Sequence, residues 1–265
     1  MSHASHSAKL NPLQFQSANF ALKFYDSATP GPAVVLLHGT FGSTASNFGL
    51  IYQALAQHFR VIGLDFQEPD TPELKIQQLV DQVIDLLDGL GLARVHLMGY
   101  SQGAVVAAAC AGMHPARVDK LVLLAGWQRS DAYLQMRNDL WWTLRKAEDE
   151  TALRQFSTLS AFSPEFVARL STAQLRATLN SVRFSAFGDK QMGLNRRVDI
   201  TEEVAAIVAP TLVLSCAQDV MIPPYLQQQL AGAISDARLE ELPGGHGVVF
   251  EDPDAVVAAV MRFLG

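Results

Sequence analysis

The chain has 265 residues, of which 49% are hydrophobic and 17% are charged. That composition predicts a folded protein with a sizeable core and excludes a disordered chain, which would combine low hydrophobicity with high net charge. The formal net charge of −6 at pH 7 does not indicate the basic surface that nucleic-acid-binding proteins carry. We therefore expect no nucleic-acid partner.

The cysteines and the apolar runs indicate the cellular compartment in which the protein is expected. Cys110 and Cys216 both lie in apolar runs, which favours buried free thiols in a reducing compartment over a disulfide. The first twelve residues lack the apolar stretch of a signal peptide, and no run approaches the roughly 18 to 20 apolar residues that span a bilayer. We expect a cytoplasmic protein with no membrane partner, and leave its oligomeric state open.

Short apolar runs alternate with longer helical patterns from about residue 33 onward. Runs of Val, Ile and Leu without alternation predict strands buried on both faces of a sheet. They cover residues 33–37, 60–65, 94–99, 120–125, 211–216 and, less apolar, 238–242. Helices are predicted near residues 45–57, 73–90, 102–113, 223–234 and 252–264. This alternation predicts an α/β fold with a mostly parallel sheet and helices on both faces.

Two segments depart from the alternation. Residues 13–17 and 20–25 are predicted strands with no room for a helix between them, so we expect an antiparallel hairpin at the sheet edge. Residues 128–197 contain helical patterns but no convincing strand, with breaks at Ser163-Pro164 and near Gly188. We therefore predict a core formed by residues 12–127 and 198–265, with about eight strands, and a helical cap or lid formed by residues 128–197.

One pentapeptide suggests covalent chemistry. Residues Gly99–Gly103 (GYSQG) join a predicted strand to an Ala-rich predicted helix. A G-x-S-x-G sequence at such a corner is typical of a nucleophile elbow, whose tight turn exposes the serine hydroxyl. The helix N-terminus behind it favours negative charge. Ser101 is therefore the candidate nucleophile.

Three further segments follow the ends of predicted strands. His38–Gly42 (HGTFG) follows the first parallel strand, Asp219 follows the fifth, and His246 lies in a glycine-rich segment after the last. Parallel strands end at one edge of a sheet, where open α/β sheets bind ligands. Of the seven histidines, only His246 combines a flexible loop with this placement, so it is the candidate base for Ser101.

These segments together resemble the serine-nucleophile members of the α/β-hydrolase superfamily, of the esterase, lipase and thioesterase kind. The resemblance covers roughly residues 12–265. It implies an α/β-hydrolase fold with a helical cap, and a catalytic triad in which Asp219 orients His246. It also implies an oxyanion hole formed by the backbone amides of Thr40 and Gln102.

The resemblance has two weak points. Some relatives carry the acid after the strand before the insertion, but Gly126-Trp127 stands there and the nearest aspartate is Asp131. Many relatives also have a D-x-R-G-x-G-x-S loop after the second parallel strand, whereas Asp65–Pro72 here contains neither arginine nor glycine. Asp219 remains the preferred acid, and no substrate transfers from the well-known subfamilies.

The expected activity is hydrolysis of a carboxylic ester or thioester through an acyl-enzyme. Serine at the elbow favours a carbonyl carbon, because relatives that act at saturated carbon carry aspartate there. Two alternatives stay open: a cofactor-free dioxygenase or lyase of the same fold, and a ligand-binding receptor. We expect a small-molecule acyl substrate that is partly apolar. The sequence has no metal-ligand spacing and no nucleotide-binding motif, so no metal or cofactor is expected.

The predicted insertion is rich in aromatic residues and arginines. The aromatic residues could form a lid over an acyl chain, although packing of the insertion onto the core is favoured for most of them. The arginines could bind an anionic carrier such as coenzyme A, although a solvated face is favoured. The aromatic residues are Trp127, Trp141, Trp142, Phe156, Phe162, Phe166, Phe184 and Phe187. The arginines are Arg129, Arg137, Arg145, Arg154, Arg169, Arg176, Arg183, Arg196 and Arg197.

Overall fold

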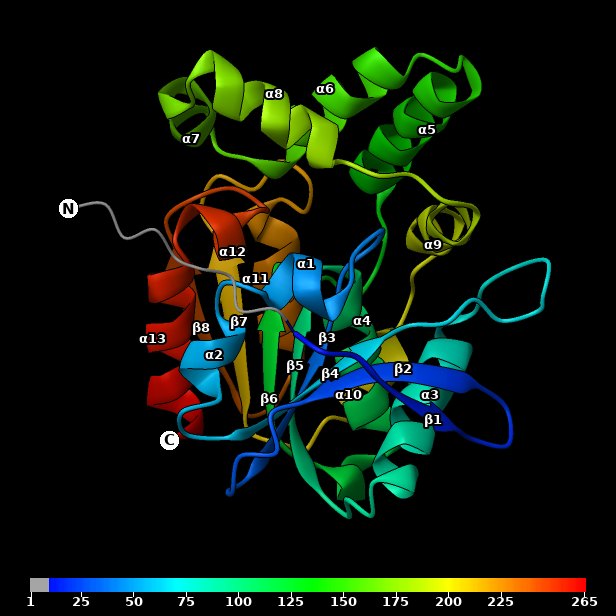
Figure 1. Cartoon of the computed structure of the whole chain (residues 1–265), viewed down its shortest axis with the longest axis vertical. Coiled ribbons are helices and arrows are strands. Elements are labelled where there is room, and N and C mark those ends of the chain that lie inside the picture. The colour runs from blue at the N-terminus through cyan, green and yellow to red at the C-terminus, as the bar shows by residue number, and fades with distance from the viewer. Residues whose placement is uncertain (1–9) are drawn as a thin grey trace.

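The computed structural model describes residues 10–265, and most of the N-terminal segment that is expected to lack a signal peptide lies outside that range. An eight-stranded sheet in the order β1-β2-β4-β3-β5-β6-β7-β8 forms its centre (Figure 1). Strands β1 and β2 form the predicted edge hairpin, β2 is antiparallel to β4, and all other neighbours are parallel. The strands are β1 (Leu13–Gln16), β2 (Ala21–Asp26), β3 (Ala33–Leu37), β4 (Arg60–Asp65), β5 (Val95–Tyr100), β6 (Val118–Leu124), β7 (Thr211–Cys216) and β8 (Ala237–Leu242).

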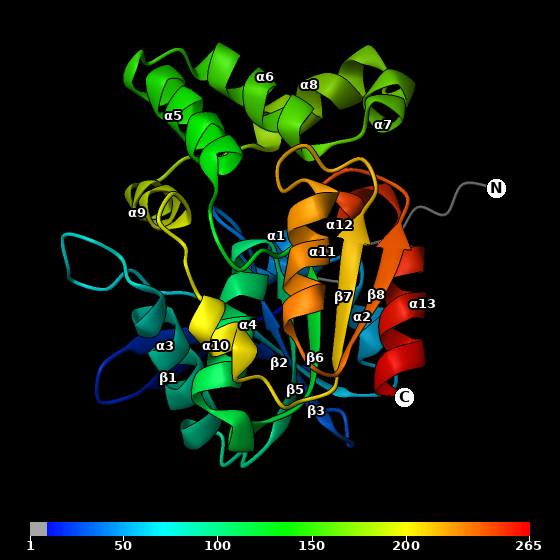
Figure 2. The same cartoon turned by 180° about the vertical axis from the view of Figure 1, so that it is seen from behind.

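Helices cover both faces of the sheet, as Figures 1 and 2 show from opposite sides. One face packs against α3 (Ile76–Gly89), α4 (Gln102–Met113), α10 (Thr201–Ala205) and α11 (Pro224–Ala233). The other packs against α1 (Thr44–Phe48), α2 (Tyr52–Leu55), α12 (Val248–Glu251) and α13 (Pro253–Leu264). A 3-10 turn (Pro115–Arg117) precedes β6.

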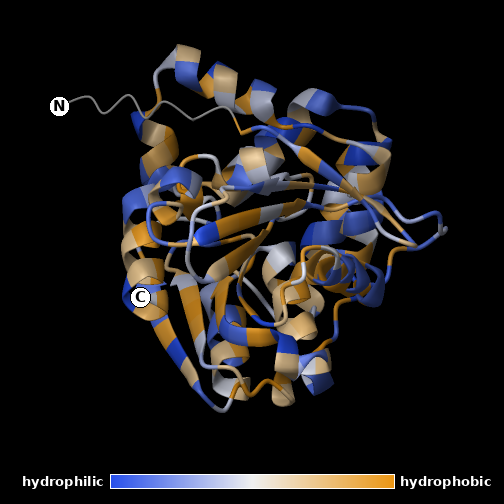
Figure 3. Cartoon of the chain, turned by 60° about the horizontal axis from the view of Figure 1, so that its bottom comes forward, coloured by the Kyte–Doolittle hydropathy of each residue, from blue (hydrophilic) through white to orange (hydrophobic). Residues whose placement is uncertain are grey.

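The strands in the middle of the sheet are the most apolar. Strands β5 and β7 are buried at every position, and Figure 3 shows the interior strands mainly in the hydrophobic colour. The edge strand β8 is exposed at several positions. Runs of Val, Leu and Ile fit the interior because both faces of these strands are covered by helices.

Six helices lie between β6 and β7; α10 packs on the sheet, and the other five form a separate group. Figure 2 shows the arrowheads of β7 and β8 pointing towards this group, so most of it lies beyond the carboxyl ends of the strands. The ends of the segment run side by side, because Ser130 N donates to Val198 O and Ile200 N donates to Gln128 O. The domain boundaries and the role as a cap stay predictions. The five helices of this group are α5 (Ala132–Lys146), α6 (Glu150–Ala161), α7 (Pro164–Arg169), α8 (Thr172–Ser181) and α9 (Ala186–Asn195).

The predicted α/β architecture with about eight strands is confirmed. The break predicted near Gly188 lies at residues 182–185, between α8 and α9. Helix α9 continues through Gly188 and begins only after Ser185, whose side chain caps it. The glycine instead allows close packing, because a Cβ at Gly188 would lie 1.9 Å from Cδ1 of Phe41. The helix predicted over residues 45–57 is divided into α1 and α2, and α12 was not predicted.

Both cysteines are free and buried, which confirms the prediction for the thiols themselves. Burial raises the pKa of Cys110 to about 12. Within residues 10–265, no helix has the length and apolar character needed to cross a membrane.

The corner between β5 and α4 leaves no space for side chains at its glycines. A Cβ at Gly103 would lie 1.9 Å from the carbonyl oxygen of Leu37, and one at Gly99 would lie 2.2 Å from that of Gly103. Both contacts are with backbone, which cannot move aside as the end of a side chain can. The sequence of the elbow is therefore fixed by packing as well as by chemistry.

We predict that Gly103→Ala lowers the free energy of unfolding by about 3 kcal/mol, because β3 or α4 must move to admit the methyl group. Gly232→Ala is the control, since a Cβ there meets no atom within 4 Å; in helix α11 it is expected to raise the free energy of unfolding by about 0.5 to 1 kcal/mol. Urea unfolding followed by circular dichroism measures both. Equal effects of the two substitutions would contradict the packing described for the corner.

Candidate active site

Ser101 occupies the corner in a strained backbone conformation. Its φ is 57° and its ψ is −125°, a region that costs a residue with a side chain roughly 1 to 3 kcal/mol. The residue is the N-cap of the 12-residue helix α4, yet its side chain makes no capping hydrogen bond. The hydroxyl group is therefore left to interact with other partners.

The structure brings Ser101, His246 and Asp219 together in one hydrogen-bonded chain. Oγ of Ser101 lies 2.8 Å from Nε2 of His246, and Nδ1 of His246 lies 2.8 Å from Oδ2 of Asp219. All three residues are buried. Because carboxylate oxygens only accept hydrogen bonds, Nδ1 carries the proton, and the lone pair of Nε2 faces the serine hydroxyl. This arrangement can remove the proton of Ser101.

The carboxylate of Asp219 is held by four donors. Its Oδ1 accepts from the amides of Met221 at 2.8 Å and Ile222 at 2.7 Å. Its Oδ2 accepts from Gln227 Nε2 at 3.2 Å in addition to His246. The sequence contained no signal for Gln227, which reaches the site from helix α11.

The rival acid has other partners. The Asp131 carboxylate caps helix α5 by accepting from the amide of Leu134, and it also accepts from the hydroxyl of Tyr225 at 2.5 Å. Asp131 is thus engaged at the start of α5, while Asp219 is bonded to His246.

The loop that carries His246 is fixed from several sides. The hydroxyl of Tyr100 donates to the carbonyl oxygen of His246 at 3.0 Å, and the amide of Gly247 donates to the carbonyl oxygen of Ala161 at 2.6 Å. Glu251 accepts from the amide of Gly245 at 3.1 Å and from the hydroxyl of Ser163. The imidazole is therefore positioned partly by helix α6 and the residues after it.

The segment after β3 packs directly against the serine. A Cβ at Gly39 would lie 3.0 Å from Cβ of Ser101. The amide of Phe41 donates to Oε1 of Gln191 at 3.1 Å, and that of Gly42 donates to the carbonyl oxygen of Gly39. In residues 10–265 the amides of Thr40 and Gln102 have no such acceptor, so they are free for a ligand.

A network of side-chain amides connects the elbow to helix α9. Gln102 Nε2 donates to Asn195 Oδ1 at 2.6 Å, and Gln191 Nε2 donates to Gln102 Oε1 at 2.8 Å. Asn195 Nδ2 then donates to the hydroxyl of Thr40 at 2.8 Å. Gln191 and Asn195 were not predicted from the sequence, because nothing local distinguishes them from other polar residues of a helix.

His38 is close to the serine loop but has a structural role. Its Nδ1 donates to the carbonyl oxygen of Gly39 at 2.8 Å, and its Nε2 accepts from the amide of Phe66 at 3.0 Å. Burial lowers the pKa of His38, which favours the neutral ring that this pair of bonds requires.

A cavity of about 730 Å³ opens in front of Ser101 and His246. Its walls come from the serine loops and from the helices between β6 and β7, and none of its lining residues is an aspartate or glutamate. Six of the aromatic residues named from the sequence line it: Trp127, Trp141, Phe156, Phe162, Phe166 and Phe184. Within residues 10–265, no group of three or more His, Cys, Asp or Glu side chains could hold a metal ion.

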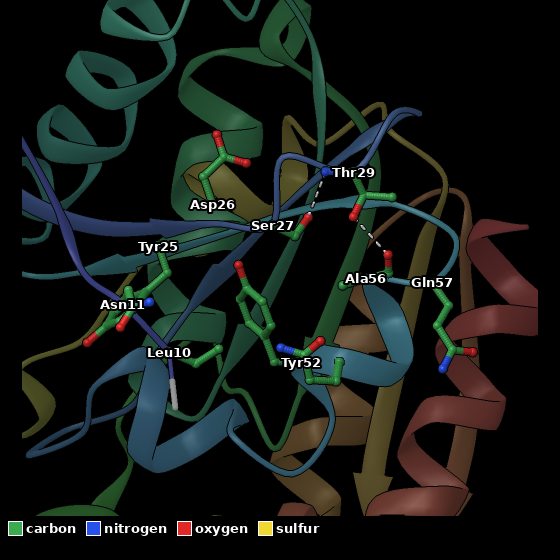
Figure 4. Close-up of a pocket in the computed structure, with 10 residues that line it drawn as sticks. Leu10, Asn11, Tyr25, Asp26, Ser27, Thr29, Tyr52, Ala56 and Gln57 are labelled. Atoms are coloured by element: carbon green, nitrogen blue, oxygen red, sulfur yellow. Dashed lines mark hydrogen bonds between the residues drawn. The ribbon is translucent and has the colours of Figure 1, made fainter. Parts of the chain in front are cut away.

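A second hollow, of about 390 Å³, lies between β2 and α2 and is drawn in Figure 4. Three of its polar side chains are engaged with the protein: Asp26 pairs with Arg60 at 2.7 Å, Tyr52 donates to the carbonyl oxygen of Val61, and Thr29 donates to that of Ala56. It contains none of the residues predicted for chemistry. The cavity at Ser101 is therefore the candidate active site.

Comparisons with known proteins find named hydrolases among the similar chains. The chain is 27% identical over 244 residues to a pyrrolizixenacetamide deacetylase of Xenorhabdus hominickii, covering 88% of this chain and 91% of that protein. It is 30% identical over 246 residues to a protein of Variovorax paradoxus (strain S110) provisionally named carbamate hydrolase RutD, covering 88% and 92%.

Solved structures give the same result for the fold. A hydrolase from Pseudomonas aeruginosa PA01 matches with a TM-score of 0.82 and 25% identity, over 97% of this chain and 99% of that one. The α/β-hydrolase MGS-M2 from a Medee basin deep-sea metagenome library matches with a TM-score of 0.83 and 22% identity, over 96% and 97%. The family model described as "Alpha/beta hydrolase family" matches residues 34–259. The chain therefore belongs to the alpha/beta hydrolase family.

Proposed function

We propose that this protein is a serine hydrolase that cleaves a carboxylic ester or thioester through an acyl-enzyme. The observation that carries the proposal is the continuous chain of hydrogen bonds from Ser101 through His246 to Asp219, with Ser101 and His246 lining a large, mainly apolar cavity. The names of two relatives, a deacetylase and a carbamate hydrolase, support attack at a carbonyl carbon. Amides and carbamates therefore belong among the substrates to be tested.

The mechanism follows from the positions of the groups. His246 Nε2 takes the proton of Ser101 while Oγ attacks the carbonyl carbon, and Asp219 stabilises the imidazolium that forms. The free amides of Thr40 and Gln102 donate to the developing oxyanion. Protonated His246 then gives its proton to the leaving group, and the acyl group stays on Ser101. A water molecule, deprotonated by the same imidazole, releases the acid and restores the hydroxyl.

We predict that Ser101→Ala or His246→Ala lowers kcat/KM for nitrophenyl esters by about 10⁴- to 10⁶-fold, because either change removes the nucleophile or its base. Asp219→Asn is expected to lower kcat by about 10⁴-fold, since an amide can favour the wrong tautomer of His246. Initial rates with a graded series of nitrophenyl esters and acyl thioesters measure these effects.

A fluorophosphonate probe provides the independent readout. It should label the wild-type chain and Ser235→Ala, in which an exposed serine is lost, but not Ser101→Ala. Failure of the wild-type chain both to label and to turn over any ester, thioester, amide or carbamate would contradict the proposal. That outcome would favour a receptor, or a dioxygenase or lyase that uses His246 as a base without an acyl-enzyme.

We predict that Gln191→Ala lowers kcat by about 10-fold with little change in KM, since its side chain holds the Phe41 amide and Gln102 and thereby places both candidate oxyanion donors. Gln191→Glu keeps an acceptor for the Phe41 amide and should recover part of the rate. The matched control is Gln229→Ala on helix α11, where the side chain is exposed. An equal loss in Gln191→Ala and Gln191→Glu, carried entirely by KM, would rule out this positioning role.

A further inference from the structure

Some polar groups that line the active-site cavity lack the partners that buried groups normally have. Seven buried side-chain nitrogen or oxygen atoms find no hydrogen-bond partner within residues 10–265, and three of them belong to residues lining this one cavity. They are Nε of Arg137, Oδ1 of Asn138 and Oγ1 of Thr158. Buried polar atoms are almost always satisfied in folded proteins. Three such groups around one cavity are therefore available to hydrogen-bond a ligand that enters it.

Arg137 is the most unusual of the three. It lies on helix α5, and its guanidinium group packs 5.9 Å from the centre of the Phe156 ring. Neither a hydrogen bond nor an ion pair of Arg137 is found among the described residues. Burial lowers the pKa of Arg137 to about 10, so the group still carries a full positive charge at neutral pH.

Other arginines of the same helical segment do have acidic partners. Arg145 pairs with Asp189 at 3.1 Å, Arg154 with Glu150 at 3.1 Å and Arg196 with Asp139 at 2.7 Å. These pairs are the solvated interactions expected of a charged helical surface. Arg137 differs because it faces a cavity and its charge is left uncompensated.

The cavity itself contains nothing that could compensate this charge. Its only charged lining residues, within the described chain, are Arg137 and Arg183, and Arg183 lies at an exposed turn where it donates to the carbonyl oxygen of Val182. Asp219 contributes a favourable field, but its oxygens already accept from His246, two backbone amides and Gln227. The site therefore presents a positive charge in apolar surroundings, which strengthens its attraction for an anion.

We propose that the substrate carries a carboxylate, remote from the carbonyl group that Ser101 attacks, and that Arg137 binds it. A carboxylate accepts hydrogen bonds from a guanidinium group in a two-point geometry. The hydroxyl of Thr158 supplies a further donor, and Oδ1 of Asn138 can accept from an N–H or O–H group of the substrate. The inference rests on the proposed function, since it names the substrate class of the same site.

Two kinds of ester separate the places where the carboxylate could lie. Nitrophenyl half-esters of adipic and suberic acid carry it on the acyl chain and are compared with nitrophenyl hexanoate and octanoate. 4-Carboxyphenyl hexanoate carries it on the leaving group and is compared with phenyl hexanoate. The inference requires that at least one charged ester has a higher kcat/KM than its neutral counterpart. Wild-type preference for the neutral ester in every pair would overturn it.

Three variants test the assignment to Arg137. Arg137→Met should lower the ratio of kcat/KM between the preferred charged ester and its neutral counterpart by about 10- to 100-fold, the value of a hydrogen bond to a charged group. Arg137→Lys should keep part of that preference. Arg176→Met removes the same charge from an exposed position of helix α8 and should leave the ratio unchanged. A ratio that does not respond to Arg137→Met, or responds equally to Arg176→Met, would overturn the inference.

Thermal unfolding gives a readout independent of activity. Removing a partly buried charge that has no partner relieves its desolvation cost, so Arg137→Met should raise Tm by roughly 2 to 4 °C without ligand. A lower Tm would assign Arg137 a structural role and count against the inference. Titration calorimetry with monomethyl adipate, on wild type and Arg137→Met, covers the case in which no ester is hydrolysed. In that case, weaker binding of monomethyl adipate by Arg137→Met supports carboxylate recognition although the proposed hydrolase function has failed. Equal binding by wild type and variant overturns the carboxylate inference as well as the proposed function.

Discussion

The close approach of β5, α4 and β3 at the elbow is the constraint on which the site depends. Gly99 and Gly103 are in contact with backbone atoms where any side chain would collide, and the chain can turn there only if Ser101 adopts its strained conformation. The surroundings maintain that strain, because β5 is hydrogen-bonded on both sides and the first ten residues of α4 are all buried. The outcome is a hydroxyl group with one orientation, which His246 can meet without rearrangement.

The constraint extends from the elbow to the helices beyond the sheet. Gln102 is bonded to Gln191 and Asn195, and these two residues also hold Phe41 and Thr40 in the other serine loop. Each amide in this network donates and accepts, so a shift of helix α9 would leave buried groups unpaired. The two loops beside Ser101 and helix α9 are therefore coupled through one hydrogen-bond network. A ligand that contacts α9 would contact a helix that is bonded to both loops.

The sequence predicted those parts of the protein that depend on local pattern. Apolar runs located the strands, and the glycines around Ser101 and His246 marked the loops at their carboxyl ends, because turn geometry and burial leave a signal in a few consecutive residues. Gln191 and Arg137 carry no such signal: each is an ordinary polar residue of a helix until the fold places it beside a distant loop or cavity. The close packing of Gly188 against Phe41 carries no local signal either, since it joins residues nearly 150 positions apart in the chain. The roles of Gln191, Arg137 and Gly188 depend on tertiary packing, which no short stretch of sequence encodes.

An unpaired arginine in an apolar cavity shapes selectivity as well as affinity. A neutral ester that fills the cavity would remove water from the guanidinium group of Arg137 without supplying a hydrogen bond in its place. Its binding would therefore lack the attraction to the charge and would also carry a desolvation cost. A carboxylate of the right length removes that penalty and adds a charge-assisted bond in surroundings where the aromatic walls keep the local dielectric low. The preference for a charged over a neutral substrate then increases as water is excluded from the cavity. The aromatic residues would contribute to this specificity by excluding water, even where they make no polar contact. In the proposed site the apolar surface and the charge of Arg137 act together, and neither alone would separate a charged substrate from a neutral one of the same shape.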